Sequence, residues 1–188
     1  LPKEHGYVWL DYARPAREDL DPLTEALGIH PLSIEDCLDE DQIPKLDEYP
    51  TNTFVLVNAY SLVDGAIVLE EVDFIVSKTF LVTVHGHFLK SGGLFDKLDA
   101  VGNLDSANVR KGPDYLFHVI LDHIVDQKFV TMEAIREELD AMEENIIYDP
   151  ASFRPENLMA LRRNLLKLRK SITHEREILV RICRRDSP

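Results

Sequence analysis

The chain has 188 residues, of which 45% are hydrophobic and 29% are charged, a composition typical of a globular domain rather than a disordered segment. Its net charge of −13 argues against the phosphate backbone of nucleic acids as a partner, because that binding needs a basic surface, and it suits cationic partners such as metal ions. Cys37 and Cys183 match neither a disulfide framework nor a zinc knuckle, and no apolar run could span a bilayer, so a reduced, cytosolic compartment is expected.

Residues 1–112 predict an α/β (α+β) domain in which helices pack on a mixed, largely antiparallel sheet. Residues 7–12 favour a strand, and leucines at helical spacing then favour a helix that ends at Gly28. Pro31 suits the first position of a second, short helix. Runs rich in β-branched residues predict three further strands, at 52–62, 66–77 and 79–85. Two weaker signals are a hairpin turn at Asp64-Gly65 and a modest helix at 94–101.

Beyond Pro113 the pattern changes to two long helices, expected from about 114 to 147 and from 156 to 186, since neither segment contains glycine or proline. Apolar residues recur three and four apart, and only Glu175 interrupts the second seam. The expected seam residues are Val125, Met132, Ile135, Leu139, Met142 and Ile146 in the first helix and Leu158, Leu161, Leu165, Leu168, Ile172, Leu179 and Ile182 in the second. Residues 113–188 therefore predict a long antiparallel helical hairpin, although periodicity alone also fits a plain coiled coil that serves oligomerisation.

The negative charge lies before the second long helix. Residues 1–150 contain 30 acidic side chains against 11 Lys and Arg, whereas residues 151–188 contain 4 against 10. The basic helix is expected to present a solvated face, or to lie against its acidic neighbour or anionic lipid headgroups.

Carboxylates are crowded in the segment that starts early in the short helix beginning at Pro31. Glu35 and Asp36 are followed by acids at 39, 40 and 41, and these five groups repel one another unless water, salt or a cation screens them. Mg²⁺ commonly takes one or two carboxylates and keeps most of its water. The alternative is a helix whose acids are favoured by its dipole and lead into a solvated loop.

A second candidate lies on the first long helix. His118, Asp122 and Asp126 share one face at spacing i, i+4, i+8, with His123 beside them. Two carboxylates at i, i+4 cost an isolated helix about 0.2–0.5 kcal/mol, which a bound cation or a neighbouring base would offset. The alternative is solvation, or salt bridges to the basic second helix.

Catalytic signatures are missing, since the sequence contains no GxSxG, GxxxxGK[ST], GxGxxG or HExxH. We therefore expect no enzyme, and a metal-dependent hydrolase would rest only on His30 near Glu35 and Asp36. His85 and His87 share a strand face and could hold a transition metal, but histidines at a strand end are usually solvated.

Five segments resemble, in order, the cytoplasmic domain of the CorA family of divalent-cation transporters. The most specific is His30–Tyr49, in which HPLSIED is followed by QIPK. The others are Phe74–His85, Asp114–Phe129, Glu137–Ile146 and Asn164–Ile172. The resemblance implies an αβα-layered domain followed by long antiparallel helices, in a homopentamer that hangs below a membrane pore.

The resemblance also implies where cations bind. In that family the sensor sites lie between subunits, and Glu35, Asp36 and Asp122 match their ligands, with Asp126 and His118 as further candidates. The stalk helix that carries the remaining ligands, and the pore with its Gly-Met-Asn signature, are not in this sequence, so we expect the chain to be part of a longer protein.

The function implied is that of a regulatory and gating domain on the cytoplasmic side of the plasma membrane. It would belong to a channel-transporter for Mg²⁺, or Co²⁺, with the same ion as cargo and regulator, and with membrane attachment through C-terminal helices beyond this sequence. Two alternatives stay open. One is a zinc transporter of the same superfamily, in which His118 and His123 would be favoured as ligands. The other is a cytosolic helical scaffold with no transport role.

Overall fold

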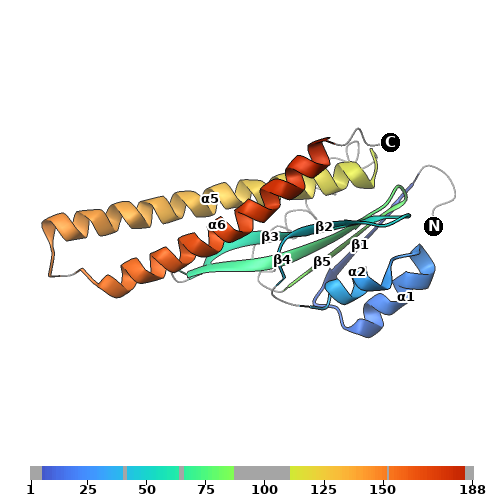
Figure 1. The fold of residues 1–188 in the computed structure, drawn as a ribbon, viewed down its shortest axis with the longest axis horizontal. Coiled ribbons are helices and arrows are strands. Elements are labelled where there is room, and N and C mark those ends of the chain that lie inside the picture. The colour runs from blue at the N-terminus through green and yellow to red at the C-terminus, as the bar shows by residue number, and fades with distance from the viewer. Residues whose placement is uncertain (1–5, 40–41, 64–65, 87–110, 152, 185–188) are drawn as a thin grey trace.

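The computed structural model describes residues 6–39, 42–63, 66–86, 111–151 and 153–184. In these residues a five-stranded sheet lies between two short helices on one face and two long helices on the other (Figure 1). The elements in chain order are β1 Val8–Ala13, α1 Arg17–Leu27, α2 Pro31–Asp36, β2 Lys45–Glu48, β3 Thr53–Val63, β4 Ala66–Val76, β5 Phe80–His85, α5 Pro113–Tyr148 and α6 Pro155–Arg184. The predicted αβα layering is confirmed, while the helix expected at 94–101 and the Asp64-Gly65 turn lie outside the described residues.

The strand order is β1-β5-β4-β3-β2, with β1 parallel to β5 and every other pair antiparallel, so the sheet is mixed as expected. The two long strands, β3 and β4, pair along their whole length. Their outer neighbours are short, because β2 pairs only with 53–56 and β5 only with 72–76. The remaining part of the β3–β4 ribbon projects beyond the sheet and runs beside the long helices (Figure 1).

Alternation along the strands divides the core between the two faces of the sheet. Phe54 and Leu56 belong to the cluster formed with α1 and α2, whereas the intervening Val55 and Val57 belong to the cluster formed with α5 and α6. The first helix ends as predicted, since Gly28 adopts the left-handed conformation (φ 68°) that glycine takes without steric cost. The sheet therefore separates the two helical layers, and residues on α2 and on α5 lie on opposite sides of it.

The short strand β2 was not predicted from the sequence. It is the four-residue segment KLDE, whose single buried residue is Leu46. Such a segment has too few apolar residues to show a period of two, and it becomes a strand because it pairs with the edge of β3. Arg181 of α6 holds it from the other side by donating a hydrogen bond of 2.9 Å to the carbonyl of Leu46.

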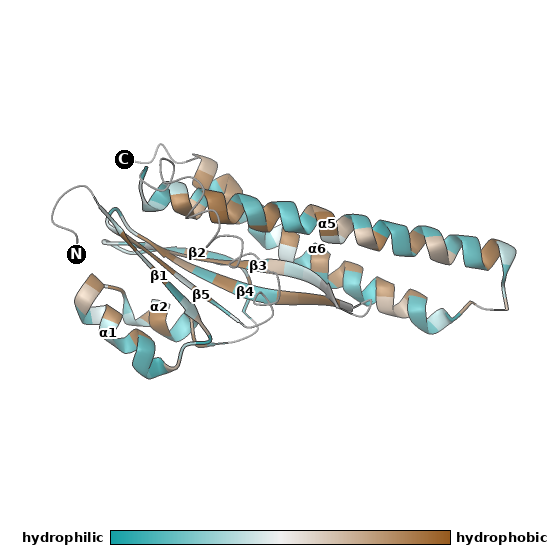
Figure 2. Ribbon diagram, turned by 180° about the vertical axis from the view of Figure 1, so that it is seen from behind, coloured by the Kyte–Doolittle hydropathy of each residue, from teal (hydrophilic) through white to brown (hydrophobic). Residues whose placement is uncertain are grey.

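The long hairpin is confirmed, but its predicted seam is half wrong. The buried positions of α6 are Leu161, Asn164, Leu168, Ser171, Glu175 and Ile178. The predicted seam residues that are exposed are Met132, Leu139, Ile146, Leu158, Leu165 and Ile172. Hydrophobic and hydrophilic segments alternate along both helices (Figure 2), so hydropathy alone does not choose the face. The buried face of α6 is the one that meets the β3–β4 ribbon, where Glu175 and Asn164 accept hydrogen bonds from backbone N–H groups of the two strands.

Candidate cation-binding site

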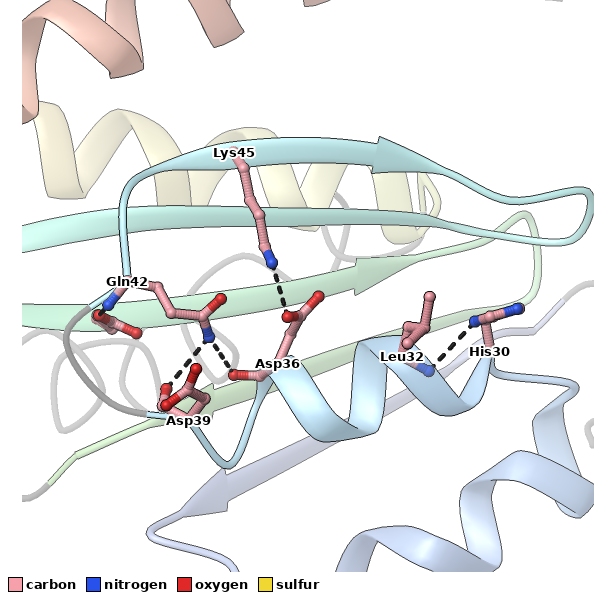
Figure 3. Close-up of polar contacts among 7 residues, drawn as sticks. His30, Leu32, Asp36, Asp39, Gln42 and Lys45 are labelled. Atoms are coloured by element: carbon pink, nitrogen blue, oxygen red, sulfur yellow. Dashed lines mark hydrogen bonds and ion pairs between the residues drawn. The ribbon is translucent and has the colours of Figure 1, made fainter.

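The N-terminus of helix α2 is capped by His30, the residue that precedes it. The His30 ring accepts a hydrogen bond of 3.2 Å at Nδ1 from the backbone N–H of Leu32, and so caps the helix that Pro31 begins (Figure 3). The same ring stacks on Tyr49, with ring centroids 4.5 Å apart. These contacts give His30 a structural task at the N-terminus of α2.

The two candidate acids of α2 differ in their surroundings. Glu35 is exposed, whereas the Asp36 side chain is 21% exposed and its Oδ1 lies 2.7 Å from the Lys45 ammonium of β2. The loop that follows α2 is fastened by Gln42, whose Nε2 donates 2.6 Å and 3.2 Å hydrogen bonds to the carbonyls of Asp36 and Asp39 (Figure 3). Asp36 is therefore already paired with a positive charge, the ammonium group of Lys45 in the same chain.

A buried carboxyl lies on the neighbouring strand. Asp73 of β4 is 4% exposed, and its Oδ1 has no hydrogen-bond partner among the described residues. Burial raises the pKa of Asp73 well above its ordinary value, the charges of Glu71 and Asp36 raise it further, and Lys45 opposes them. Burial likewise raises the pKa of the Cys37 thiol, with Asp73 adding to the shift, so Cys37 stays protonated.

Asp73 lines a cavity of about 700 Å³ between the α2–β2 loop, the first and middle parts of β4 and the middle of α6. The walls differ in charge. Glu71 and Asp73 belong to the strand side, and Lys167, Lys170 and His174 to α6. Part of the predicted basic face of α6 thus lies toward acids of the same chain.

The candidate residues of α5 share an exposed face. His118, Asp122 and Asp126 share one helix face, as their spacing predicts, and all three are solvent-exposed. Because α5 and α2 cover opposite faces of the sheet, one chain does not bring Asp122 together with Glu35 and Asp36 (Figure 1). Among the described residues no three His, Cys, Asp or Glu side chains converge to hold a metal ion.

The expectation that His85 is solvated is wrong, because this histidine is buried and has a role within the sheet. Its Nδ1 lies 2.8 Å from the carbonyl of Gly86 and its Nε2 lies 3.3 Å from Asp11 Oδ2. Burial lowers the pKa of His85, but the hydrogen bond and charge of Asp11 outweigh it and leave the pKa raised. Both ring nitrogens thus face oxygen acceptors, which favours the imidazolium. His87, its predicted metal-binding neighbour, lies outside the described residues.

Sequence reasoning missed a buried ion pair. Glu175, which interrupts the predicted apolar seam, pairs with Lys128 of α5, and both side chains are at most 12% exposed. Glu175 Oε1 also accepts a 2.9 Å hydrogen bond from the backbone N–H of Asn58, beyond the point where β2 stops pairing with β3. Asn58 Nδ2 donates a 2.8 Å bond to Ser171 on α6. The signal for this ion pair in the sequence was Glu175 itself, a charged residue inside an apolar seam.

The buried Asp73 predicts how stability depends on pH. A carboxyl whose pKa is raised in the folded state binds more protons folded than unfolded, so stability falls as pH rises above its ordinary value of 3.8. Asp73→Asn removes this loss, and we expect it to raise the free energy of unfolding by about 1–3 kcal/mol at pH 7, with the gain shrinking toward pH 4. Urea unfolding at several pH values measures this.

The control for this prediction is Asp140→Asn, which removes an exposed acid of α5. It should change stability by less than about 0.5 kcal/mol at either pH. A loss of stability at pH 7 in Asp73→Asn would mean that the carboxylate is ionised and well paired.

Comparison with known proteins agrees with this architecture. A family model described as "CorA-like Mg2+ transporter protein" matches residues 4–188. The chain is 31% identical over 184 residues to YfjQ of Bacillus subtilis, covering 96% of the chain and 55% of YfjQ. It is 30% identical over 181 residues to the cobalt/magnesium transport protein CorA of Thermotoga maritima, covering 94% and 51%. The chain thus spans about half the length of these relatives.

Solved structures share the fold. The complete CorA magnesium transporter of Methanocaldococcus jannaschii superposes with a TM-score of 0.79 at 21% identity, over 97% of this chain and 57% of that one. The cytoplasmic domain of ZntB from Vibrio parahaemolyticus superposes with a TM-score of 0.66 at 13% identity, over 88% and 64%. None of the described helices combines the length and apolarity that crossing a membrane requires.

Proposed function

The chain belongs to the CorA-like Mg²⁺ transporter family, and from this premise we propose that it is the cytoplasmic, regulatory part of a plasma-membrane transporter for Mg²⁺ or Co²⁺. The observation that carries the proposal is the match of family and fold over nearly the whole chain. This match favours transport over a helical scaffold without a transport role. The divalent ion is the cargo, and we propose that it is also the regulator.

The acids of α2 and α5 suit a hydrated divalent cation. Glu35 and Asp122 are exposed, and Asp36, the last residue of α2, is partly exposed. Mg²⁺ keeps most of its water and accepts one or two carboxylates, so these groups can hold it without being buried. Glu35, Asp36 and Asp122 are therefore the proposed ligands, with Asp126 and His118 beside them on α5.

The separation of these acids supports a site shared between copies of the chain. Since the sheet lies between α2 and α5, an ion that uses both Asp36 and Asp122 must take them from two subunits. Leu158, Leu165 and Ile172 are exposed at seven-residue spacing along α6, and such a stripe of apolar residues commonly marks an interface. We propose a homopentamer, as the family resemblance implies.

The proposed regulation is a shift between two populations. An ion between carboxylates of adjacent subunits neutralises like charges and favours a closed, symmetric assembly. When the cytosolic ion concentration falls, the carboxylates repel one another, and the subunits loosen so that ions can enter. The ion acts as a regulator only to the extent that it binds the closed state more tightly than the open one.

Limited proteolysis of the full-length protein tests this proposal. We expect Mg²⁺ to protect the α5–α6 hairpin in the wild-type protein, and we expect the double variant Asp36→Asn/Asp122→Asn to lose this protection. Asp126→Asn should weaken it less, and Asp140→Asn, which changes an exposed acid outside the proposed ligand set, should leave it unchanged. Equal protection of the wild type and the double variant would mean that Asp36 and Asp122 are solvated surface groups and do not bind the ion.

Zinc transport is the second candidate, and the exposed His118 near Asp122 favours it, because Zn²⁺ prefers imidazole to carboxylate alone. The same assay distinguishes the two ions. Protection by Zn²⁺ at concentrations at which Mg²⁺ has no effect, together with its loss in His118→Gln, would favour zinc. Protection by Mg²⁺ that is unchanged in His118→Gln supports Mg²⁺.

A further inference from the structure

We propose that Lys45 is a tethered cation that occupies Asp36 when no divalent ion is bound, and that it moves to Asp73 when a divalent ion takes its place. The inference rests on the proposed function, because it takes Asp36 as a ligand of the divalent ion. It assigns to Lys45 and Asp73 the tuning of the ion concentration at which the site fills.

The first observation is the ion pair itself. Lys45 is the first residue of β2, and its Nζ lies 2.7 Å from Asp36 Oδ1 (Figure 3). The two side chains are 33% and 21% exposed, so the ammonium is partly screened from water but can leave its partner without crossing a packed core. A divalent ion that uses this oxygen of Asp36 must first displace a positive charge already in contact with it.

The second observation is the position of Asp73. Lys45 is the register partner of Leu56, and Leu56 is the register partner of Asp73, so the three residues form a row across β2, β3 and β4. Leu56 belongs to the core under α1 and α2, so the side chains on either side of it point toward α2 as well. Residues two strands apart have Cα atoms about 10 Å apart, which an extended lysine and an aspartate span together.

The third observation is that Asp73 can accept another hydrogen bond. It is 4% exposed, it lines the cavity, and its Oδ1 lacks a hydrogen-bond partner among the described residues. An unsatisfied buried oxygen is costly, so an ammonium released from Asp36 gains a partner there. Lys45 already acts on the pKa of Asp73, lowering it against the effect of burial, so the ammonium is within electrostatic range.

The consequence is an exchange of cations at Asp36. Without a divalent ion, Lys45 pairs with Asp36 and ties the end of α2 to β2, so the repulsion between subunits comes from the exposed Glu35 and Asp122. With the ion bound, Lys45 turns to Asp73 and the ion neutralises Asp36. An internal competitor lowers the apparent affinity of a site by the fraction of time for which it occupies that site, so Lys45 raises the ion concentration needed for closure.

The test is the Mg²⁺ concentration that gives half-maximal protection of the full-length protein from proteolysis. We expect Lys45→Met to lower it about three- to tenfold, because the competitor is gone. Asp73→Leu should raise it, because leucine has no oxygen to accept the ammonium, which then stays on Asp36. In the Lys45→Met/Asp73→Leu double variant, the Asp73 change should have no further effect. Lys78→Met, which removes the same charge from an exposed lysine, should leave the concentration unchanged.

The outcomes separate this inference from the proposed function. If Mg²⁺ protects the wild type in an Asp36-dependent way but Lys45→Met needs as much or more Mg²⁺, the exchange is overturned while the function stands. An equal shift on changing Asp73 with and without Lys45 also overturns it. If Asp36→Asn has no effect on protection of the wild type, the proposed function fails and this inference fails with it. A melting curve without Mg²⁺ confirms for each variant that the fold is retained.

Discussion

Replacing Glu175 by alanine is expected to lower the free energy of unfolding by about 3–5 kcal/mol, because it leaves the buried ammonium of Lys128 without its carboxylate. The change also removes the acceptor of the Asn58 backbone N–H at the open edge of β3. Burial lowers the pKa of Lys128, and Glu175 opposes that shift. Without Glu175 the pKa of Lys128 should fall further. The loss of stability should therefore be largest well below the ordinary lysine pKa of 10.5 and shrink as the pH rises toward it. Urea unfolding followed by circular dichroism measures the loss.

Two further variants identify the cause of this loss. Glu177→Ala changes an exposed glutamate of the same helix and should cost less than about 0.5 kcal/mol. Glu175→Gln combined with Lys128→Met keeps an acceptor for Asn58 while removing both charges. This double variant should recover most of the stability, because a buried ion pair is often replaceable by neutral groups. Equal losses in Glu175→Ala and Glu177→Ala would contradict the buried network.

Phe74→Ala is expected to cost about 3–5 kcal/mol, the usual range for removing a buried phenylalanine. Phe74 of β4 is fully buried, and its ring meets Phe117 of α5 edge to face, with centroids 5.0 Å apart. The pair anchors the first turns of α5, which carry His118 and Asp122, against the sheet. The loss should therefore be accompanied by faster hydrogen exchange of amides in this part of α5.

The matched control for Phe74 is Phe129→Ala. Phe129 lies on α5 with 70% of its surface exposed, so its removal should change the stability of the isolated chain by less than about 0.5 kcal/mol. Denaturant unfolding of both variants with the same slope against concentration would make the comparison direct. A cost below about 1 kcal/mol for Phe74→Ala would mean that α5 is not packed on β4 as described.

Local patterns in the sequence determined most elements of the fold. Strands β3 and β4 follow from alternating apolar residues that serve two cores, and α5 and α6 follow from long runs without glycine or proline. Gly28 marks the end of α1 because a residue with positive φ is needed there. These features depend on backbone preferences and periodicities within a few residues, which a single sequence displays. The segments that resemble the CorA family added the layered architecture, which the structure confirms.

Only the tertiary structure decided which surfaces meet. The carboxylate of Glu175 accepts a hydrogen bond from the backbone N–H of Asn58, 117 residues away. A residue that interrupts an apolar seam in the sequence thus satisfies a backbone group at a strand edge in the fold. Residues 45–48 form strand β2 because they pair with the edge of β3. Lys45 contacts Asp36 because β2 and α2, which carry them, are neighbours in space. The candidate ligands Asp36 and Asp122 lie on opposite sides of the sheet for the same reason. Pairing between distant segments depends on the whole chain's packing, and no local period encodes it.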